Sequence, residues 1–474
     1  MGILLKTFYR LPYSARCVAA TIQGYRLRHQ RYGPETEALV QEAHERETWS
    51  PEQWKAWTEE RLAYVLHRAA TRVPYYRDHW AERRRRGDRA SWEILENWPL
   101  LEKEEVRRAP ERFVSEDIPA GRLFREMTSG TTGTPLVLVR SIETTRALYA
   151  LSLARTRLWH GLSLRDRWGM IGTKAVAPLW NRRPPFWVWN AALRQLYMSC
   201  HHLAPDLVQH YLDALARYRV LYLYGLTSSL HALAQEILAL GRRDLRMHVV
   251  ITNAESVFEH QRRAIEEAFQ CPVRETYGMG ELVAAASECP HGRLHVWPEV
   301  AHFQIMRGGE PVPAGESGEV VGTCLINPAM PLIRYRVGDL ARMDPDPAPC
   351  PCGRRLPRLA AVDGRSEDAI LTRDGRNLSA SLSTVFYGLP LREAQIVQDA
   401  IERLTVRYAP APGFTTTHAA ALTGRLREQL GDITITLEEV AAVPRTPAGK
   451  VRAAICNISA EEREAVLASV RAQR

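Results

Sequence analysis

The stretch Met127-Thr128-Ser129-Gly130-Thr131-Thr132-Gly133-Thr134-Pro135 carries the residues best suited to hold phosphate groups. Its six positions from Thr128 to Gly133 are all glycine or hydroxyl residues, which cannot form a hydrophobic core. Glycine lets the backbone approach a ligand, and hydroxyl and free amide groups donate hydrogen bonds. The oxygens of a polyphosphate require many such donors in a small space. We therefore predict a phosphate-binding loop, with an ordinary polar turn as the alternative.

Extended residues follow this loop, from Leu136 to Val139, so the loop is expected to connect the two strands of a hairpin. A Walker loop would instead end in Gly-Lys-Ser/Thr and begin a helix. That ending is absent, and Leu136 stands where many phosphate loops have a lysine.

The middle of the chain alternates between strand and helix patterns up to about residue 330. Strands are predicted at Trp168–Gly172, Val220–Tyr224, Met247–Thr252 and Val273–Thr276, and helices at about 205–218, 227–240 and 257–269. Such alternation is typical of a layered, largely parallel α/β sheet. Ligands of these sheets bind at the carboxyl ends of the strands. Three polar segments lie there and predict one pocket: 224–229, 253–255 and 275–281.

Short strands and turns dominate from Leu294 to Met343 and predict a small β-barrel-like subdomain. Beyond Gly364 the pattern becomes strand, helix, strand, at Leu404–Tyr408, Thr417–Leu430 and Ile433–Val440. We expect an α/β protein with a large N-terminal domain over residues 1–363. This domain would include a basic helical leader at 1–95 and the barrel-like part at about 294–363. A small α+β C-terminal domain over 364–474 would be joined to it by a hinge.

The composition is that of a globular protein, with 474 residues, 45% hydrophobic residues and a formal net charge of +9. No signal peptide is evident and no apolar run reaches membrane-spanning length, so the expected location is the cytoplasm. Residues 1–32 contain six basic residues and no acidic one. We interpret them as a surface helix that covers the domain; peripheral contact with an anionic membrane is the alternative. The Arg83–Arg86 run is expected to be a solvated loop without interleaved aromatic residues, so no nucleic-acid partner is predicted.

Four motifs in order resemble the adenylate-forming superfamily, and within it the branch of phenylacetate–CoA ligases and CapK-like proteins. The first is the Gly/Thr loop described above. The others are Tyr277-Gly278-Met279-Gly280-Glu281, Tyr335-Arg336-Val337-Gly338-Asp339 and Pro444-Arg445-Thr446-Pro447-Ala448-Gly449-Lys450. The stretch from Trp98 to Arg107 and the missing lysine at Leu136 point to the phenylacetate–CoA ligase branch.

The resemblance implies an enzyme that joins a small carboxylic acid to the α-phosphate of ATP and then transfers the acyl group, most simply to CoA. Both reactants of the first step are anions, so cations and pre-aimed donors must offset their repulsion. The family pattern implies catalytic roles for Lys450, Glu281 and Thr128, with Mg²⁺ held by Glu281. It implies nucleotide contacts from Ser129, Gly130, Thr131, Thr132, Gly133, Asn253, Ala254, Glu255, Thr276, Tyr277, Gly278, Met279, Asp339 and Arg365.

Tyr277 would stack on adenine, and Asp339 and Arg365 would contact the ribose. Glu255 has two interpretations: it lines the adenine pocket, or it caps the next helix. The pocket for the carboxylic acid substrate is expected to be mostly apolar and to be formed by Tyr224, Gly225, Thr276, Gly278 and Met279. The resemblance also places a hinge at Gly364–Glu367. The stretch after it, Asp374 to Ser379, matches the ligase branch only in part, so an amine or alcohol acceptor is an alternative to CoA. A non-catalytic nucleotide-binding scaffold is a further alternative.

Two short cysteine segments, Cys289-Pro290-His291 and Cys350-Pro351-Cys352-Gly353, provide candidate zinc ligands. Thiolates and imidazole are common tetrahedral zinc ligands, and proline and glycine favour the tight turns between them. We predict Cys289, His291, Cys350 and Cys352 as the ligands, with His295 as a substitute for His291. Free thiols or a disulfide remain the alternative. The sequence leaves open the acid, the acceptor and the oligomeric state.

Overall fold

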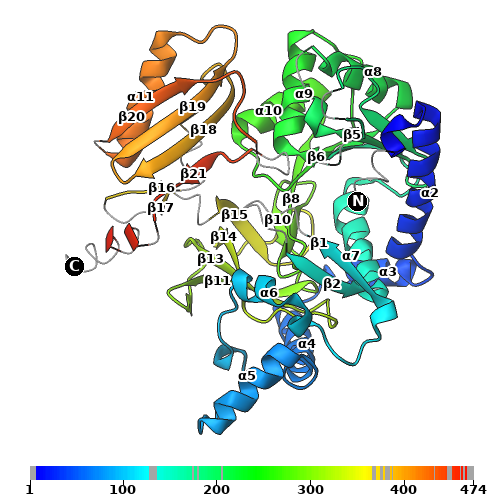
Figure 1. The fold of residues 1–474 in the computed structure, drawn as a ribbon, viewed down its shortest axis with the longest axis vertical. Coiled ribbons are helices and arrows are strands. Elements are labelled where there is room, and N and C mark those ends of the chain that lie inside the picture. Colours follow the sequence, from blue (N-terminus) through cyan, green and yellow to red (C-terminus); the bar gives the residue numbers. More distant parts are fainter. Residues whose placement is uncertain are drawn as a thin grey trace.

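The structure is a computed structural model. It describes residues 7–127, 136–172, 174, 176–178, 181–203, 206–365, 370–373, 377–378, 385–386, 388–431, 433–445, 451–459, 461–462 and 465–466. A large domain is built on one extended sheet, and a small domain with its own sheet lies beside it (Figure 1).

The large sheet has 13 strands in the order β12-β11-β13-β14-β15-β10-β9-β8-β7-β6-β3-β5-β4. Strands β5, β3, β6, β7 and β8 run parallel, and β4 closes this end as an antiparallel edge strand. The bounds of these six strands are Gln195–Ser199, Trp168–Gly172, Tyr222–Leu226, Val250–Asn253, Val273–Gly278 and Trp187–Asn190. The predicted parallel α/β layer is confirmed, and the predicted strand Trp168–Gly172 has the bounds of β3. Three further predicted strands correspond to β6, β7 and β8, with shifts of up to three residues at their ends.

Antiparallel strands form the other half of the sheet, where the sequence predicts short strands between Leu294 and Met343. They continue from β8 through β9 and are hydrogen-bonded into the same sheet. Their bounds are β9 Ala285–Glu288, β10 Leu294–Val296, β11 Ala301–Arg307, β12 Glu310–Pro311, β13 Gly318–Cys324, β14 Tyr335–Met343 and β15 Arg358–Arg365.

Helices α8 (Val208–Tyr218), α9 (Thr227–Ala239) and α10 (Glu259–Phe269) follow strands of the parallel half. They bury apolar residues such as Leu212, Leu230 and Ile265 against the strands, in one continuous hydrophobic core. All three helices occupy predicted ranges, because their apolar residues recur at the period of an α-helix.

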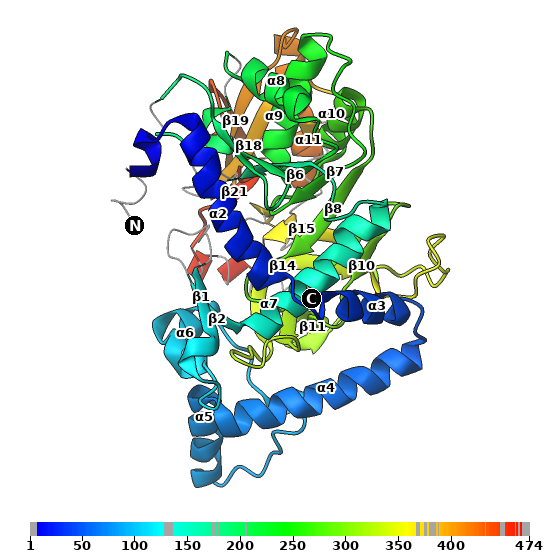
Figure 2. The same cartoon turned by 90° about the vertical axis from the view of Figure 1, so that its right-hand side faces the viewer.

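The N-terminal part of the chain is helical, with α2 (Tyr13–Arg31), α3 (Thr36–Arg46), α4 (Pro51–Arg72), α5 (Pro74–Arg85) and α6 (Lys103–Arg108). In Figure 2, α2 lies across the face of the large domain and α4 runs along its lower edge. Ser50 and Gln53 form a capping box at the start of α4, where Pro51 occupies the first helical position.

The prediction of a solvated loop without aromatic neighbours at Arg83–Arg86 is wrong. Arg83 to Arg85 form the last turn of α5, and the Arg83 guanidinium lies 4.4 Å from the centre of the Trp80 ring. Arginine has a good helix propensity, and positive charge is favourable at the carboxyl end of a helix. The run therefore prolongs α5 and covers tryptophan surface.

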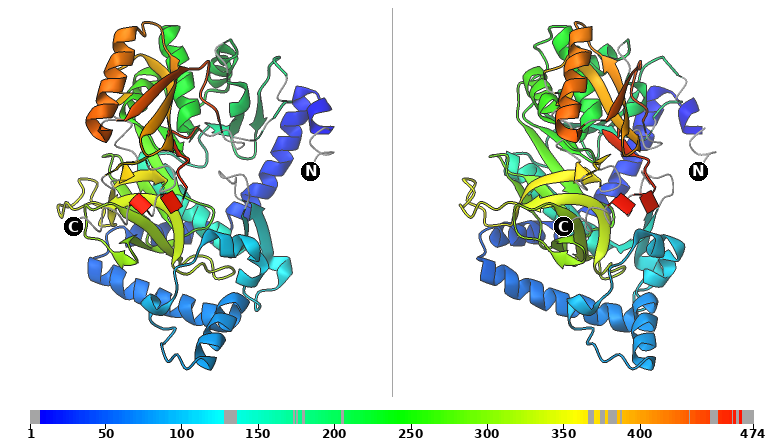
Figure 3. Two further views of the ribbon diagram at one scale, coloured as in Figure 1. Left: turned by 60° about the vertical axis from the view of Figure 1, so that its left-hand side comes forward. Right: turned by 90° about the vertical axis from the view of Figure 1, so that its left-hand side faces the viewer.

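The C-terminal domain contains a four-stranded sheet in the order β20-β19-β18-β21. Its elements are β18 (Leu391–Ala400), β19 (Arg403–Pro410), α11 (Thr416–Leu430), β20 (Thr434–Glu439) and β21 (Ala454–Cys456). The predicted strand, helix and strand of this domain are confirmed as β19, α11 and β20. Figure 3 shows this sheet next to the large domain, on the side away from α2. Two short strands, β16 (Ile370–Leu371) and β17 (Asn377–Leu378), lie between the domains in sequence.

A buried ion pair ties the helical layer to the sheet. Helix α7 (Ile142–Ser152) continues as a π-helical turn over Leu153–Arg157, which carries Arg155. The Arg155 side chain is fully buried and donates two hydrogen bonds, of 2.8 and 2.7 Å, to the Glu299 carboxylate. Such a pair is costly to break, because removing one partner leaves the other charge buried without compensation.

We therefore expect Glu299→Ala to lower the free energy of unfolding by about 3–5 kcal/mol, measured by urea denaturation. The matched control is Glu259→Ala, which breaks the exposed Arg263–Glu259 pair and should cost under about 1 kcal/mol. Equal losses in the two variants would show that Arg155–Glu299 contributes no more than a surface pair.

Candidate functional site

A cavity of about 530 Å³ lies where the large domain meets the C-terminal domain. The carboxyl ends of β7 and β8, the start of α9, and both strands of the predicted hairpin contribute to its wall. The C-terminal domain contributes 389–394 and 451–454. The cavity therefore has residues from both domains around one space.

Most of the predicted site residues at the strand ends are brought together. Ala254, Glu255, Thr276, Tyr277, Gly278, Met279 and Glu281 all line the cavity. Asn253, Tyr224 and Gly225 are not among the lining residues. A Cβ atom at Gly225 would lie 2.8 Å from the carbonyl oxygen of Ile171, so this glycine permits close approach of β6 and β3. The Tyr224 ring packs edge-on against Trp168.

Tyr277 and Asp339, predicted to contact adenine and ribose, are in direct contact. The Tyr277 hydroxyl donates a 2.8 Å hydrogen bond to Asp339 Oδ2. Gly338 precedes the aspartate with a φ of +78°, a conformation that favours glycine. Asp339 is buried and pairs across β14 and β15 with Arg365, so the backbone places these two predicted ribose contacts opposite each other.

Glu281, for which the resemblance implies the role of a magnesium ligand, is buried and lines the cavity. Its Oε1 lies 3.3 Å from Lys103 Nζ and accepts a 3.3 Å hydrogen bond from the Tyr335 hydroxyl. A carboxylate in such a position is suited to bind Mg²⁺ together with phosphate oxygens. Lys103, the first residue of α6, is a functional candidate that the motifs alone did not identify. The sequence signal that could have pointed to Lys103 is Leu136, which stands where many phosphate loops have a lysine.

The predicted hairpin is confirmed by its strands, β1 (Leu123–Met127) and β2 (Val137–Ser141), which pair in antiparallel register. Met127 and Leu138 line the cavity, so the connection between these strands begins and ends at its wall. The connection itself lies outside the described residues, together with the predicted phosphate contacts Thr128, Ser129, Gly130, Thr131, Thr132 and Gly133.

The Glu255 carboxylate accepts hydrogen bonds from both domains. In the large domain it accepts from the Ser228 backbone amide (2.7 Å) and the Ser228 hydroxyl (3.1 Å), at the start of α9. From the C-terminal domain it accepts the backbone amide of Val451 (3.0 Å). Glu255 thus caps the helix that precedes it in the sequence, and the prediction that it caps the next helix is wrong. Burial raises its pKa, against the lowering effect of these hydrogen bonds.

Arg445, five residues before Lys450, contacts both domains. Its guanidinium donates to the Ser228 hydroxyl (3.2 Å) and to Glu393 (2.6 Å), and its backbone forms an antiparallel bridge with Val451. Lys450 lies outside the described residues. Its neighbour Val451 lines the cavity, so the sequence neighbourhood of this lysine is at the site.

Two further ionisable groups of the cavity have strongly shifted pKa values. Burial, and then the neighbouring Glu288 carboxylate, raise the pKa of Glu275 to about 8. A carboxyl group that stays protonated at neutral pH can donate a hydrogen bond as well as accept one. Burial, and then the nearby His260, lower the pKa of His231 to about 3, so this imidazole is neutral.

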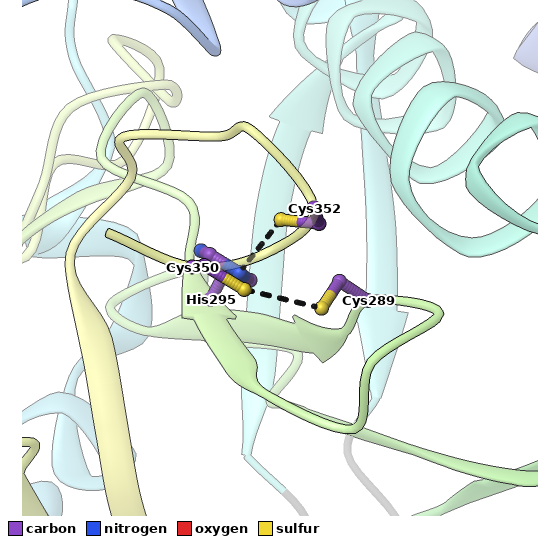
Figure 4. Close-up of side chains that lie close together, drawn as sticks. All are labelled: Cys289, His295, Cys350 and Cys352. Carbon is purple, nitrogen blue, oxygen red and sulfur yellow. Dashed lines mark hydrogen bonds between the residues drawn. The ribbon is translucent and has the colours of Figure 1, made fainter. Parts of the chain in front are cut away.

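Three cysteines and one histidine meet at a second place in the large domain (Figure 4). One ligand atom from each of Cys289, His295, Cys350 and Cys352 lies within 4.8 Å of all the others. The cysteine predictions are confirmed in their juxtaposition, and His295 takes the place predicted for His291. His291 is exposed in the turn after Cys289, whereas His295 is buried on β10.

The distances in this cluster match those of a tetrahedral zinc site. Ideal tetrahedral geometry with Zn–S of about 2.3 Å and Zn–N of about 2.0–2.1 Å requires S···S of about 3.8 Å and S···N of about 3.5 Å. The Cys289 and Cys350 sulfurs are 3.7 Å apart, and Cys352 Sγ lies 3.5 Å from His295 Nε2. His295 Nδ1 lies 3.3 Å from the Leu356 carbonyl oxygen, a contact that leaves Nε2 available as a ligand.

Comparison with known proteins agrees with this geometry. Residues 370–457 match the CapK C-terminal domain family. The chain is 24% identical to protein CapK of Staphylococcus aureus, over 76% of this chain and 80% of that protein. It is 26% identical to the phenylacetate–coenzyme A ligase of Thermus thermophilus, over 73% and 78% of the two chains.

Among solved structures, a 2-hydroxyisobutyryl-CoA ligase superposes with a TM-score of 0.67 and 20% identity, and covers 90% of this chain and 94% of its own. The predicted fold class is thereby confirmed. Over most of its length the chain is similar to protein CapK and to a phenylacetate–CoA ligase, the branch of the adenylate-forming superfamily that the four motifs indicate.

Within the described residues, no helix has the length and hydrophobicity that crossing a lipid bilayer requires.

Proposed function

We propose that the protein joins a small carboxylic acid to the α-phosphate of ATP, with release of pyrophosphate, and then transfers the acyl group from the adenylate to the thiol of CoA, with release of AMP. The observation that carries this proposal is the arrangement around the cavity. Tyr277 is hydrogen-bonded to Asp339, Glu281 lines the same cavity, and the Val451 amide donates a hydrogen bond to Glu255. These residues would offer one nucleotide an aromatic face, a ribose acceptor and a metal ligand, next in sequence to Lys450.

The first half-reaction brings two anions together, so its catalysis depends mainly on positioning and electrostatics. Tyr277 would stack on adenine while Asp339 accepts the ribose hydroxyls. Bound Mg²⁺ would supply positive charge at the phosphates, held by Glu281. Lys450 would stabilise the charge that develops between the carboxylate and the α-phosphate.

Lys103 would supply the charge that the phosphate loop lacks at Leu136. Its ammonium group reaches the cavity from α6 and is 3.3 Å from Glu281, in the half of the site that faces the hairpin. The ion pair with Glu281 would hold the lysine in place until phosphate oxygens enter.

A second acceptor class is favoured by one observation. The stretch from Asp374 to Ser379 matches the pattern of the ligase branch only in part. An amine or alcohol is therefore the alternative acceptor to CoA. Product analysis with each acceptor, after the acid is identified, separates the two.

The decisive experiment is ATP–pyrophosphate exchange across a panel of aryl and short-chain carboxylic acids. We expect at least one acid to support exchange, and Lys450→Ala to reduce that exchange by about 10²–10³-fold, the effect of removing one transition-state donor. Lys55→Ala, on the exposed face of α4, is the control and should leave exchange unchanged. Absence of exchange with every acid and of magnesium-dependent ATP binding would refute the proposed activity.

Glu255 is proposed as a positioning residue that holds the Lys450 loop over the site during adenylation only. We expect Glu255→Gln to slow exchange by about ten- to hundredfold, since it weakens a charge-assisted hydrogen bond to Val451. Acyl transfer from a presynthesised acyl-adenylate should change little, because rotation of the C-terminal domain breaks this contact.

The control for this variant is Glu438→Gln, which alters the Arg407–Glu438 ion pair at the surface of the C-terminal domain. Faster hydrogen–deuterium exchange around Val451, with an unchanged melting temperature, should accompany the Glu255 effect. Equal slowing of both half-reactions would contradict a role confined to adenylation.

We also propose that Cys289, His295, Cys350 and Cys352 hold a structural zinc ion. The cluster packs against Trp54 and Trp159, and Glu47 accepts hydrogen bonds from Trp159 Nε1 (2.6 Å) and Arg354 Nε (2.8 Å). A metal at this place would therefore fasten the cysteine loop to the end of α3.

Purified protein should contain about one zinc ion per chain by elemental analysis, as four protein ligands leave no open position for catalysis. Cys350→Ser should lose most of this zinc and unfold at a lower temperature. Cys271→Ser, a buried cysteine outside the cluster, should retain the zinc. A wild-type protein without stoichiometric metal after purification in zinc-containing medium would exclude the site.

A further inference from the structure

Helix α2 exposes an apolar stripe that nothing in the described structure covers. Val18, Ile22 and Tyr25 are 58%, 54% and 61% exposed and follow the i, i+4, i+7 spacing of one helix face. Arg26 and Arg28 are exposed on the two sides of this stripe. The helix contains no acidic residue.

The opposite face of α2 is fixed to the large domain. Gly24 is buried, and a Cβ atom there would lie 2.1 Å from the Asn190 side chain. The Arg16 guanidinium donates a 2.9 Å hydrogen bond to the Val176 carbonyl, and Thr21 accepts one from the Ala191 amide. The predicted surface helix is thus real, but it covers the domain with one face and presents the apolar stripe on the other.

The charge of the chain is concentrated where α2 packs. Residues 1–34 and 167–205 contain 11 of the 63 Lys and Arg residues and none of the 54 Asp and Glu residues. The rest of the chain therefore holds 52 basic and 54 acidic residues, and the net positive charge of +9 arises from these two segments. The segments lie side by side, since α2 packs along β4 and its preceding loop. In the second segment, Arg167, Lys174, Arg182, Arg183 and Arg194 are all exposed.

We propose that this basic face, made by α2 and the exposed basic residues of the second segment, docks the protein on an anionic lipid bilayer. One of these residues, Arg182, is paired with the Asp206 carboxylate. Aliphatic and aromatic side chains in the centre with arginines around them suit the boundary between acyl chains and anionic headgroups. Nucleic acid would match the arginines, but its phosphates have no contact to offer Val18 and Ile22.

The position of this face is compatible with the proposed reaction. α2 and the C-terminal domain lie on opposite sides of the parallel strands in Figures 1 and 3. Docking through α2 would leave the C-terminal domain free to move.

The test is sedimentation of the full chain with vesicles of phosphatidylcholine alone and of phosphatidylcholine mixed with phosphatidylglycerol. We expect binding to the anionic vesicles that falls at high salt and is weak on the neutral ones. Val18→Ser with Ile22→Ser and Tyr25→Ser, and separately Arg26→Glu with Arg28→Glu, should each reduce binding by about tenfold or more.

Matched controls come from exposed residues elsewhere: Leu240→Ser and Ile94→Ser for the stripe, and Arg85→Glu for the charge. These should bind like the wild type, and circular dichroism should show all variants folded. Equal binding to both vesicle types, no effect of either α2 variant, or an effect of the stripe on dimerisation alone would overturn the proposal. The protein could instead fail to bind vesicles but bind an oligonucleotide in a salt-sensitive way. If the stripe substitutions leave that binding unchanged, the face would be assigned to nucleic acid.

Discussion

A buried carboxylate at the end of β7 must find hydrogen-bond donors, and in this protein both domains supply them. Glu255 accepts a hydrogen bond from the Ser228 amide at the start of α9, and another from the Val451 amide of the C-terminal domain. Because a buried charge without partners is costly, this requirement draws the two domains together at one point. The cavity follows from that contact, since the ends of β7 and β8 and the hairpin strands already surround the same space. A reaction between two anions requires such a place, where donors are aimed before the reactants arrive.

The remaining charges are distributed in keeping with separate tasks. At the cavity, acidic groups outnumber basic ones on the described wall, and each is held by a defined partner or by burial. Lys103 balances Glu281, and Arg445 balances Glu393. On the far side of the parallel strands lie residues 1–34 and 167–205, whose charged residues are all Lys or Arg. Because the positive charge lies on the α2 face and not at the cavity, the protein could bind an anionic surface without adding to the positive potential at the cavity.

Four clustered side chains, Cys289, His295, Cys350 and Cys352, join segments of the large domain that are distant in sequence. Cys289 lies just after β9, His295 lies on β10, and the other two cysteines lie in the loop before β15. The same loop contacts α3 through Glu47. Together with the buried Arg155–Glu299 pair, this contact fastens the N-terminal helices to the antiparallel half of the sheet. The helices in turn carry Lys103 and the basic face.

The amino-acid sequence by itself determined the elements and the chemistry. Apolar periodicity predicted β3, α8, α9, α10 and α11 closely, because buried strands and amphipathic helices have distinct repeats. The motifs selected Tyr277, Glu281 and Asp339, which the structure brings to one cavity, and Lys450, which lies outside the described residues. Only the tertiary structure decided which residues that are distant in the sequence come into contact. It selected His295 over His291, brought Lys103 to Glu281 from 178 residues away, removed Gly225 from the pocket, and turned the Arg83 run into the end of a helix. These outcomes depend on packing between distant segments, which no local pattern of residues contains.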